Sequence, residues 1–131
     1  MVHGVTGLPL PGRPRVLLAE DHPGVAKAVC RVLALDCNVV GRVADGSAVL
    51  EAAQRLQPDV IVIDFNLPTV NGLEACRQIR RVNPEAKVII FSAMNDPGVK
   101  QRSVDVGASA FVCKGTGDLL STVRRLCDDR G

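Results

Sequence analysis

Tryptophan and tyrosine are absent from this sequence of 131 residues, and phenylalanine occurs only three times. A folded core must therefore be built mainly from Val, Leu, Ile and Ala, and the hydrophobic fraction of 47% is large enough for one. An excess of charge of one sign is lacking too, because 16 basic and 14 acidic residues give a formal net charge of +2. This balance gives no electrostatic indication of nucleic-acid binding.

Recognisable cysteine patterns are also missing. The sequence has five cysteines, an odd number, with no CxxC pair and no spacing typical of a zinc site. Most of them lie inside apolar segments, where a thiol behaves as a small hydrophobic group. We therefore interpret them as reduced core residues of a cytoplasmic protein. These cysteines are Cys30, Cys37, Cys76, Cys113 and Cys127.

The length fits one ordinary domain and is too short for two domains with separate cores. Residues 1–14 are rich in Gly and Pro and contain no apolar run that could form a signal peptide or a membrane span. We interpret residues 1–14 as a flexible N-terminal extension, 15–128 as the domain and 129–131 as a C-terminal tail. No membrane partner is expected.

Short apolar runs and helix-like stretches alternate from residue 15 onward. Four runs are continuous and rich in β-branched residues, which is typical of strands buried on both faces of a parallel sheet. They cover residues 16–19, 60–63, 88–91 and 110–113. A weaker run over 37–43 contains Asn38 and Arg42, which favours a strand at the edge of the sheet.

Between these runs, apolar residues recur at helical spacing in four stretches. The stripes are Val25, Val29, Val32 and Leu33; Val49, Ala52, Ala53 and Leu56; Leu73, Cys76 and Ile79; and Leu119, Leu120, Val123, Leu126 and Cys127. Residues 97–106 have a poor stripe, so we expect a weakly packed helix there, with Gly107 as its left-handed cap. The pattern predicts a single α/β domain, a doubly wound, flavodoxin-like (βα)5 sandwich with a parallel five-stranded sheet in the order 2-1-3-4-5.

Polar residues follow the predicted strands at their carboxyl ends. Glu20 and Asp21 end the first strand, Asp64 the third, Ser92 the fourth and Lys114 the fifth. Ligands of open α/β sheets bind at this edge, where the first and third strands are neighbours. Three crowded carboxylates need counter-charges, which Lys114 and a hard divalent cation, Mg²⁺ or Mn²⁺, can supply.

Such a site suits phosphoryl transfer, which depends on positioning and charge neutralisation. A carboxylate can itself be the nucleophile and form an aspartyl phosphate. Each of these residues alone also has an ordinary structural role, as a turn former, a helix cap or a solvated strand end. Their joint placement at one sheet edge is what favours a functional site.

Several segments together resemble the receiver domains of two-component response regulators, most closely those of the NarL/LuxR-type branch. The resemblance covers roughly residues 15–128 and holds in order and spacing, which makes it more specific than a single motif. It rests on residues 18–23, 60–68, 71–72, 91–93 and 107–114, which include Glu20-Asp21-His22-Pro23 and Gly107-Ala108-Ser109-Ala110-Phe111.

The resemblance implies a phosphoacceptor and a metal site. Asp64 is the expected phosphoacceptor, with a sensor histidine kinase or a small phosphodonor as its source. Asp21, Asp64 and the backbone carbonyl of Asn66 are the expected ligands of Mg²⁺, and Glu20 is expected to act through water. The domain would then be a signalling module rather than an enzyme, although it would assist its own phosphorylation and slow dephosphorylation.

The resemblance also implies a switch. Lys114 is expected to pair with phosphoryl oxygens, Ser92 to hydrogen-bond the phosphoryl group and Phe111 to rotate in response. The surface of the fourth helix, fifth strand and fifth helix would then change, for homodimerisation or for control of a DNA-binding output domain that we expect only outside residues 1–131.

Three positions depart from the family pattern. Ser92 stands where Thr is common and keeps the hydroxyl group. Gly115 stands where many members have Pro, and Met94 is an apolar residue two positions after Ser92.

Two other functions use similar features. A small phosphatase or phosphotransferase of the haloacid-dehalogenase kind would need a second acid two residues after Asp64, where Asn66 stands. A degenerate receiver that serves as an unphosphorylated dimerisation module would usually lack one of the site residues, all of which are present here.

Overall fold

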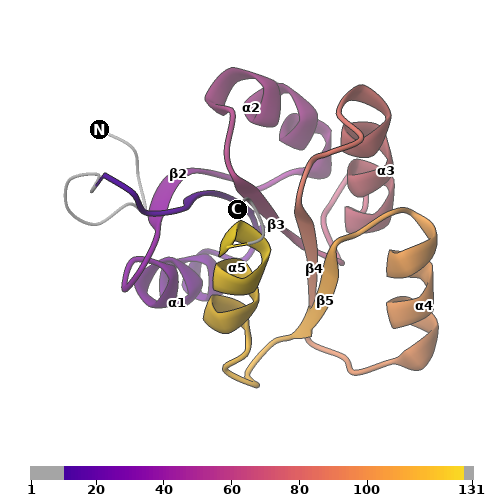
Figure 1. The fold of residues 1–131 in the computed structure, drawn as a ribbon. Helices are drawn as coiled ribbons and strands as arrows, with labels where there is room; N and C mark the ends of the chain where they lie inside the picture. The colour runs from indigo at the N-terminus through magenta and orange to yellow at the C-terminus, as the bar shows by residue number, and fades with distance from the viewer. Residues whose placement is uncertain (1–10, 129–131) are drawn as a thin grey trace.

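The computed structural model describes residues 11–128, and each predicted strand and helix is present in it. The five strands are β1 (Arg15–Ala19), β2 (Asn38–Val43), β3 (Val60–Asp64), β4 (Val88–Ser92) and β5 (Ala110–Cys113). The helices are α1 (Pro23–Leu33), α2 (Val49–Leu56), α3 (Gly72–Val82), α4 (Pro97–Asp105) and α5 (Leu119–Asp128), with a short 3-10 helix, η1 (Gly46–Ala48), before α2. Strands and helices alternate along the chain, which Figure 1 follows from indigo to yellow.

The strands form one parallel sheet in the order β2-β1-β3-β4-β5, which confirms the predicted topology. β3 and β4 are buried at every position, as expected for strands whose two faces are both covered. β2 is an edge strand, as predicted, and its register with β1 shifts: Val16 pairs with Val39, but Leu17 pairs with Gly41. Because of this bulge, the end of β2, including Arg42, is shifted by one residue in its pairing with β1.

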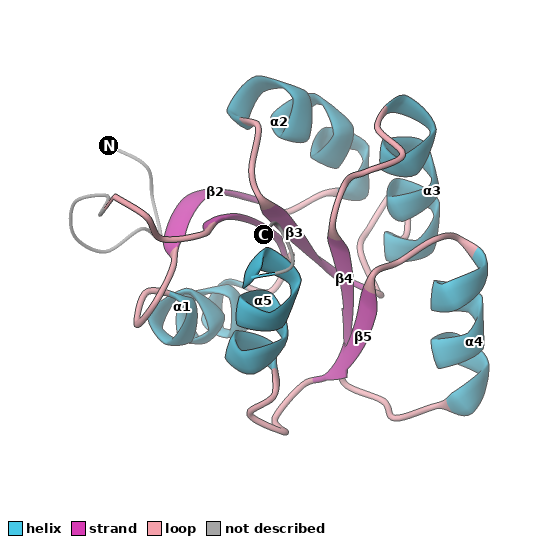
Figure 2. Ribbon diagram, viewed as in Figure 1, coloured by secondary structure: helices cyan, strands magenta, loops and turns pink. Residues whose placement is uncertain are grey.

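Helices cover both faces of the sheet (Figure 2). α1 and α5 pack on one face, where Leu18 of β1 belongs to the same buried cluster as Leu33 and Val123. α2 and α3 pack on the other face, where Leu17 of β1 clusters with Ile79. Neighbouring residues of β1 thus serve different cores, because side chains alternate across a strand.

The apolar face of α1 differs from the prediction at one residue. Val32 is 45% exposed, so its assignment to the buried stripe is wrong. The small residues Ala26 and Cys30 are buried instead, together with Val29 and Leu33, and they move the centre of the buried face away from Val32.

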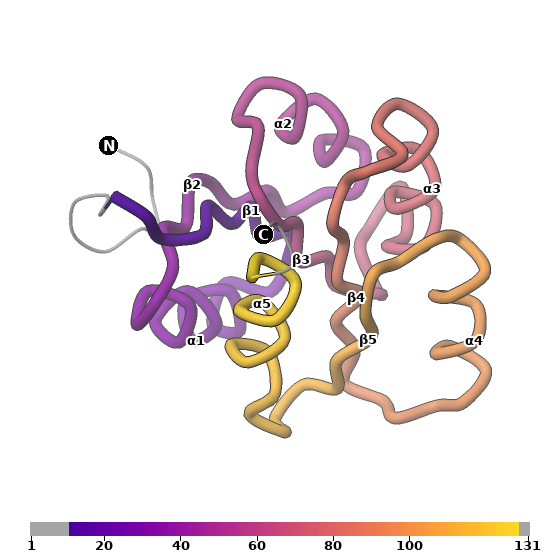
Figure 3. Tube along the Cα trace, in the orientation of Figure 1, coloured from indigo at the N-terminus to yellow at the C-terminus, as the bar shows by residue number. Residues whose placement is uncertain are grey.

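α4 has few buried residues, in agreement with its weak apolar stripe. Only Val99 and Ser103 are buried among its nine residues, and Val104 is exposed. Figure 3 shows the helix at the side of the molecule, beside β5. Gly107 follows with a φ of +89°, which agrees with the predicted left-handed cap.

The expected core location is correct for all the cysteines except Cys113. All five thiols are free, and Cys30, Cys37, Cys76 and Cys127 are buried. Cys113 is only partly buried, because it lies in the edge strand β5, beside a surface depression. The core interpretation is therefore wrong for this residue.

Most of the expected N-terminal extension lies outside the described residues, as does the tail 129–131. Just before β1, Arg13 donates a hydrogen bond to the Ala34 carbonyl (3.2 Å), and the Pro14 carbonyl accepts one from the Asn38 N–H (2.8 Å). Among the described residues, no helix combines the length and the apolar character that a membrane span requires.

Gly46 and Gly72 stand where another chain segment leaves no room for a side chain. A Cβ atom on Gly46 would lie 1.6 Å from the carbonyl oxygen of Val70. A Cβ atom on Gly72 would lie 2.5 Å from the carbonyl oxygen of Asp64. Glycine at these two positions therefore allows the loop that leads from β3 to α3 to pack closely against them.

Replacing Gly46 by Ala is expected to lower the free energy of unfolding by about 1–3 kcal/mol, because the new methyl group meets backbone rather than a flexible side chain. Urea unfolding followed by circular dichroism measures the change. Gly98→Ala in α4 is the matched control, since its Cβ would approach only the Asp96 carboxylate, at 3.2 Å. Gly98→Ala should be neutral or stabilise by up to about 1 kcal/mol. Equally small effects at both positions would contradict the tight packing at Gly46.

Candidate functional site

Three carboxylates meet at the carboxyl ends of β1 and β3. Glu20, Asp21 and Asp64 each offer one oxygen, and these oxygens lie within 4.8 Å of one another. β1 and β3 are neighbours, with Ala19 paired to Ile63, so the residues that follow these two are brought side by side. Glu20 and Asp64 are 1% and 5% exposed, whereas Asp21 is exposed. The structure thus brings together the carboxylates that were grouped from the sequence.

Lys114 supplies the positive charge of this cluster. Its Nζ lies 2.7 Å from Oε1 of Glu20 and 3.1 Å from Oδ1 of Asp64. Its backbone N–H donates to the carbonyl of Ser92 at 2.6 Å, which ties the end of β5 to the end of β4. Nζ also lies 5.4 Å from the centroid of the Phe91 ring. One lysine therefore bridges both buried carboxylates.

The pKa of Lys114 is raised above its ordinary value of 10.5. Burial is the largest single influence and lowers the pKa, but the hydrogen bonds and charges of Glu20 and Asp64 together outweigh it. The ammonium group is therefore retained throughout the neutral pH range.

The donor set fits a hard divalent cation, because the cluster offers carboxylate oxygens and no soft ligand. Oε1 of Glu20 accepts from Lys114, and Oε2 accepts from the His22 N–H at 3.1 Å. Both oxygens of Glu20 are thus engaged by the protein. Asp21 and Asp64 are the carboxylates better placed to ligate a cation directly.

The other predicted site residues lie around this cluster. Ser92 is buried at the end of β4, and its Oγ accepts a hydrogen bond from the Met94 N–H at 3.1 Å. Phe111 is partly buried in β5 and packs against the core on the α2–α3 face. Asn66 is exposed in the loop after Asp64. Ser92 and Lys114 are joined directly by the backbone hydrogen bond described above, whereas Phe111 lies in the middle of β5.

Gly115 follows Lys114 with a φ of +86°, and no described peptide bond is cis. A proline cannot adopt this φ, because its ring fixes φ near −65°. The loop after Lys114 therefore has a backbone conformation that a chain with proline at this position could not adopt.

A contact that the sequence did not predict joins α4 to the residue after Asp64. The guanidinium carbon of Arg102 lies 5.9 Å from the centroid of the Phe65 ring, a cation–π arrangement. The Phe65 N–H donates to the carbonyl of Phe91 at 2.9 Å, so this ring belongs to a segment held between β3 and β4. α4 is thereby connected to the neighbourhood of Asp64.

Arg42 is a second residue at the site that the sequence did not single out. It was predicted only as a polar residue of an edge strand, yet its side chain donates hydrogen bonds to the carbonyls of Glu20 and Asp21. The available signal was a cation in an otherwise apolar run. The bulge in β2, which determines where Arg42 lies relative to β1, has no recognisable sequence mark.

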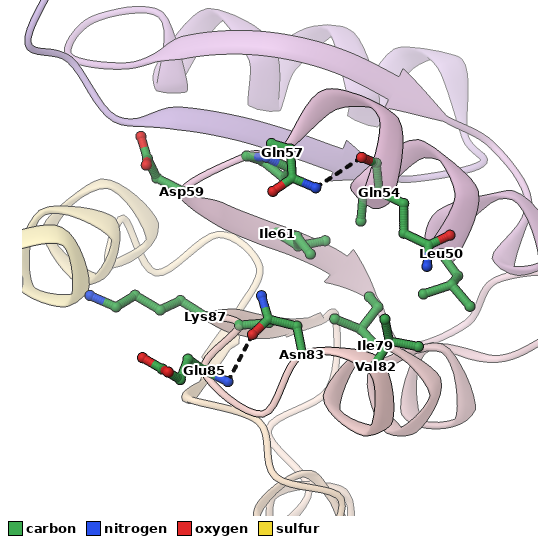
Figure 4. A pocket seen from close by; sticks show the side chains of 13 residues that line it. Leu50, Gln54, Gln57, Asp59, Ile61, Ile79, Val82, Asn83, Glu85 and Lys87 are labelled. Carbon is green, nitrogen blue, oxygen red and sulfur yellow. Dashed lines mark hydrogen bonds between the residues drawn. The ribbon is translucent and has the colours of Figure 1, made fainter.

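A pocket lies at the opposite, amino-terminal edge of the sheet, between α2 and α3 (Figure 4). Its volume is about 250 Å³, and Leu50, Ile61, Ile79 and Val82 contribute its apolar lining. None of the predicted site residues lines it. It is therefore separate from the cluster around Asp64.

Comparison with known proteins identifies the family. The response regulator receiver domain matches residues 16–124, which is most of the chain. This chain belongs to the response-regulator receiver-domain family.

The relatives of this receiver domain include NarL- and LuxR-type regulators. The response regulator GacA of Pseudomonas viridiflava is 35% identical over 114 residues, which cover 84% of this chain and 53% of GacA. The receiver domain of NarL from Mycobacterium tuberculosis has a TM-score of 0.80 at 30% identity and covers 91% of this chain and 97% of that structure. A LuxR-family regulator from Aurantimonas sp. SI85-9A1 has a TM-score of 0.83 at 27% identity, over 89% of this chain and 87% of that structure. This chain spans about half the length of the curated relatives it matches.

Lys114→Met is expected to lower the free energy of unfolding of the receiver by about 1–3 kcal/mol at neutral pH in metal-free buffer, because it leaves two buried carboxylates without their cation. The effect is smaller than for a fully buried pair because 19% of the lysine side chain is exposed. Since the folded-state pKa is raised, this stabilisation is fully present below pH 10.5 and is lost as the pH rises through the folded-state pKa.

Denaturant unfolding of both proteins between neutral and alkaline pH measures this difference. Lys27→Met, which removes an exposed lysine of α1, is the control and should change stability little at any pH. A Lys114→Met effect no larger than that of Lys27→Met would contradict the importance of the ion pairs.

Proposed function

We propose that this receiver domain is a phosphorylation-activated switch in which Asp64 accepts a phosphoryl group from a sensor histidine kinase or a small phosphodonor. The observation that carries the proposal is the bridge from Lys114 to both Glu20 and Asp64, at 2.7 and 3.1 Å. The bridge holds a cation beside the carboxylate that would attack phosphorus, where it could also neutralise charge on the phosphoryl oxygens. Family membership supports a phosphoacceptor, and the bridge supports Asp64 as that residue.

Bound Mg²⁺, or Mn²⁺ in its place, would supply positive charge for the phosphoryl oxygens. Asp21, Asp64 and the backbone carbonyl of Asn66 would hold the cation, with Glu20 acting through water. One oxygen of Asp64 forms the new bond to phosphorus, while the bond from phosphorus to the donor breaks and the leaving group takes its electron pair. Lys114 then turns from the carboxylates to the phosphoryl oxygens. The protein would thus assist its own phosphorylation and its slow dephosphorylation, as a signalling domain rather than an enzyme.

The phosphoryl group would place new acceptor oxygens near Ser92 and Lys114. The Ser92 hydroxyl has a proton to donate, and its oxygen now accepts from the Met94 N–H. Turning this hydroxyl toward Asp64 would disturb the loop that leads into α4. α4 is held by few buried residues, so it is the element most readily displaced.

The surface of α4, β5 and α5 would carry the signal. This surface has a depression of about 350 Å³, lined by residues that include Lys100, Phe111, Cys113 and Ser121. Phe111 both lines the depression and packs on the core, so its rotation would alter the surface. We infer a role in homodimerisation or in the control of a DNA-binding output domain of a longer regulator. Free cysteines are compatible with a place in the cytoplasm.

Incubation with Mg²⁺ and acetyl phosphate is expected to add the mass of one phosphoryl group to the domain, because Asp64 has a buried, lysine-paired carboxylate. Intact-mass spectrometry measures the gain, and Asp64→Asn should show none. An unmodified wild type, or an equal gain in Asp64→Asn, would contradict the proposal. Continuous turnover of unrelated phosphoesters would instead favour a phosphatase.

Beryllofluoride, a phosphoryl mimic, is expected to change the concentration dependence of association if the α4–β5–α5 surface mediates homodimerisation. Sedimentation velocity with and without the mimic measures this change, and Asp64→Asn should not respond. An unchanged profile of the beryllofluoride-bound wild type would contradict regulated homodimerisation and would leave control of a different partner.

A further inference from the structure

Arg42 lies at the carboxyl end of the edge strand β2, beside the loop that joins β1 to α1. Its Nε and Nη2 donate to the carbonyl oxygen of Glu20 at 3.0 and 2.9 Å. Nη2 also donates to the carbonyl oxygen of Asp21 at 3.2 Å. One planar guanidinium group therefore holds two consecutive carbonyls of the acidic loop, a geometry that suits arginine and that a lysine cannot reproduce.

These hydrogen bonds complete the fixation of the loop backbone. A peptide unit is planar, so one good hydrogen bond at either end strongly restricts its orientation. The unit before Glu20 is held by its N–H, which donates to the Val43 carbonyl at 3.0 Å. The peptide unit after Glu20 and the one after Asp21 are both held at their carbonyl oxygens, which accept hydrogen bonds from Arg42. The peptide unit after Asp21 is also held at its N–H, because the His22 N–H donates to the Glu20 carboxylate.

The consequence concerns Asp21 in particular. Its side chain is exposed and packing does little to restrict it. However, both peptide units that flank its Cα are held, so the direction of its Cα–Cβ bond is held as well. The bulge in β2 makes this possible, because it sets Arg42 beside Leu18 and Val43 beside Ala19, at the end of β1.

We propose that Arg42 is a positioning residue for the divalent-cation site: it aims the carboxylates of Glu20 and Asp21 through the backbone, without touching the cation or the phosphoryl group. This inference rests on the proposed function, because the cation is the one that phosphorylation of Asp64 would use. Its physical basis is the preorganisation of ligands by groups behind them, whose loss typically weakens metal binding by about 10- to 100-fold.

The charge of Arg42 makes the proposal testable, because loss of the charge and loss of the positioning would change the affinity for Mg²⁺ in opposite directions. A guanidinium group near a cation site repels the cation, so removal of its charge alone would strengthen Mg²⁺ binding. Loss of positioning would weaken it. Arg42→Gln removes both the charge and the fork of donors, whereas Arg42→Lys keeps the charge and loses only the fork.

The experiment measures the dissociation constant of Mg²⁺ by isothermal titration calorimetry, with Mn²⁺ binding by electron paramagnetic resonance as a second readout. Wild type, Arg42→Lys, Arg42→Gln and the charge control Arg81→Gln, which changes an exposed arginine of α3, are compared. Thermal unfolding in EDTA first establishes that each variant is folded at the temperature of titration. If Arg42→Gln does not fold, Arg42→Lys carries the comparison.

We expect Arg42→Gln to weaken Mg²⁺ binding about tenfold, Arg42→Lys, which keeps the repelling charge, to weaken it at least as much, and Arg81→Gln to leave it within about twofold of wild type. Unchanged or tighter binding by a folded Arg42 variant would overturn the positioning role. Absence of Mg²⁺ binding by the wild type would instead overturn the proposed metal site itself, so the two failures are distinguishable.

Discussion

Two buried carboxylates, Glu20 and Asp64, share one lysine at the carboxyl edge of the sheet. Carboxylates this close repel each other, and burial weakens the solvation that would otherwise offset the repulsion. Lys114 can oppose only part of that charge, since Asp21 adds a third carboxylate to the cluster. The site is thus poised to take up positive charge. The parallel order of the sheet creates this situation, because it places the ends of β1, β3 and β5 at one edge.

The central part of the fold was predictable because its sequence signals are redundant. The runs at 60–63 and 88–91 are continuous and apolar, and the structure buries both strands at every position. The positions of residues at strand ends can be predicted equally well, because once β3 is placed, Asp64 must stand at its carboxyl end. The gathering of Glu20, Asp21 and Asp64 follows from the topology alone, without knowledge of any side-chain conformation.

The features that escaped prediction depend on register or on small shifts of a helical face. The β2 bulge moves Arg42 by one position relative to β1, and a one-residue slip reverses the side of the sheet on which a side chain lies. Val32 is exposed because Ala26 and Cys30, which are weak markers of burial, define the inner face of α1. The Arg102–Phe65 contact joins α4 to the loop after β3, and no periodicity encodes their relative placement.

The two sides of the site differ in how firmly they are held, and this difference gives the proposed switch a direction. On the β2 side, Arg42 holds the acidic loop. The Gly46 N–H, which donates to the Pro68 carbonyl at 3.2 Å, and the Thr69 hydroxyl, which donates to Asp45 at 2.8 Å, hold the loop after Asp64. On the β5 side, α4 buries only Val99 and Ser103, and Gly115 and Gly117 both have positive φ values.

A phosphoryl group on Asp64 would face a firmly held backbone on the β2 side and less constrained segments on the β5 side. Displacement toward α4 and β5 would therefore cost the least free energy, because fewer interactions would have to be broken there. The same asymmetry explains why positioning of the cation and transmission of the signal can be assigned to different residues. In the proposed switch, Arg42 would act where the backbone stays fixed, and Ser92 would act where it moves.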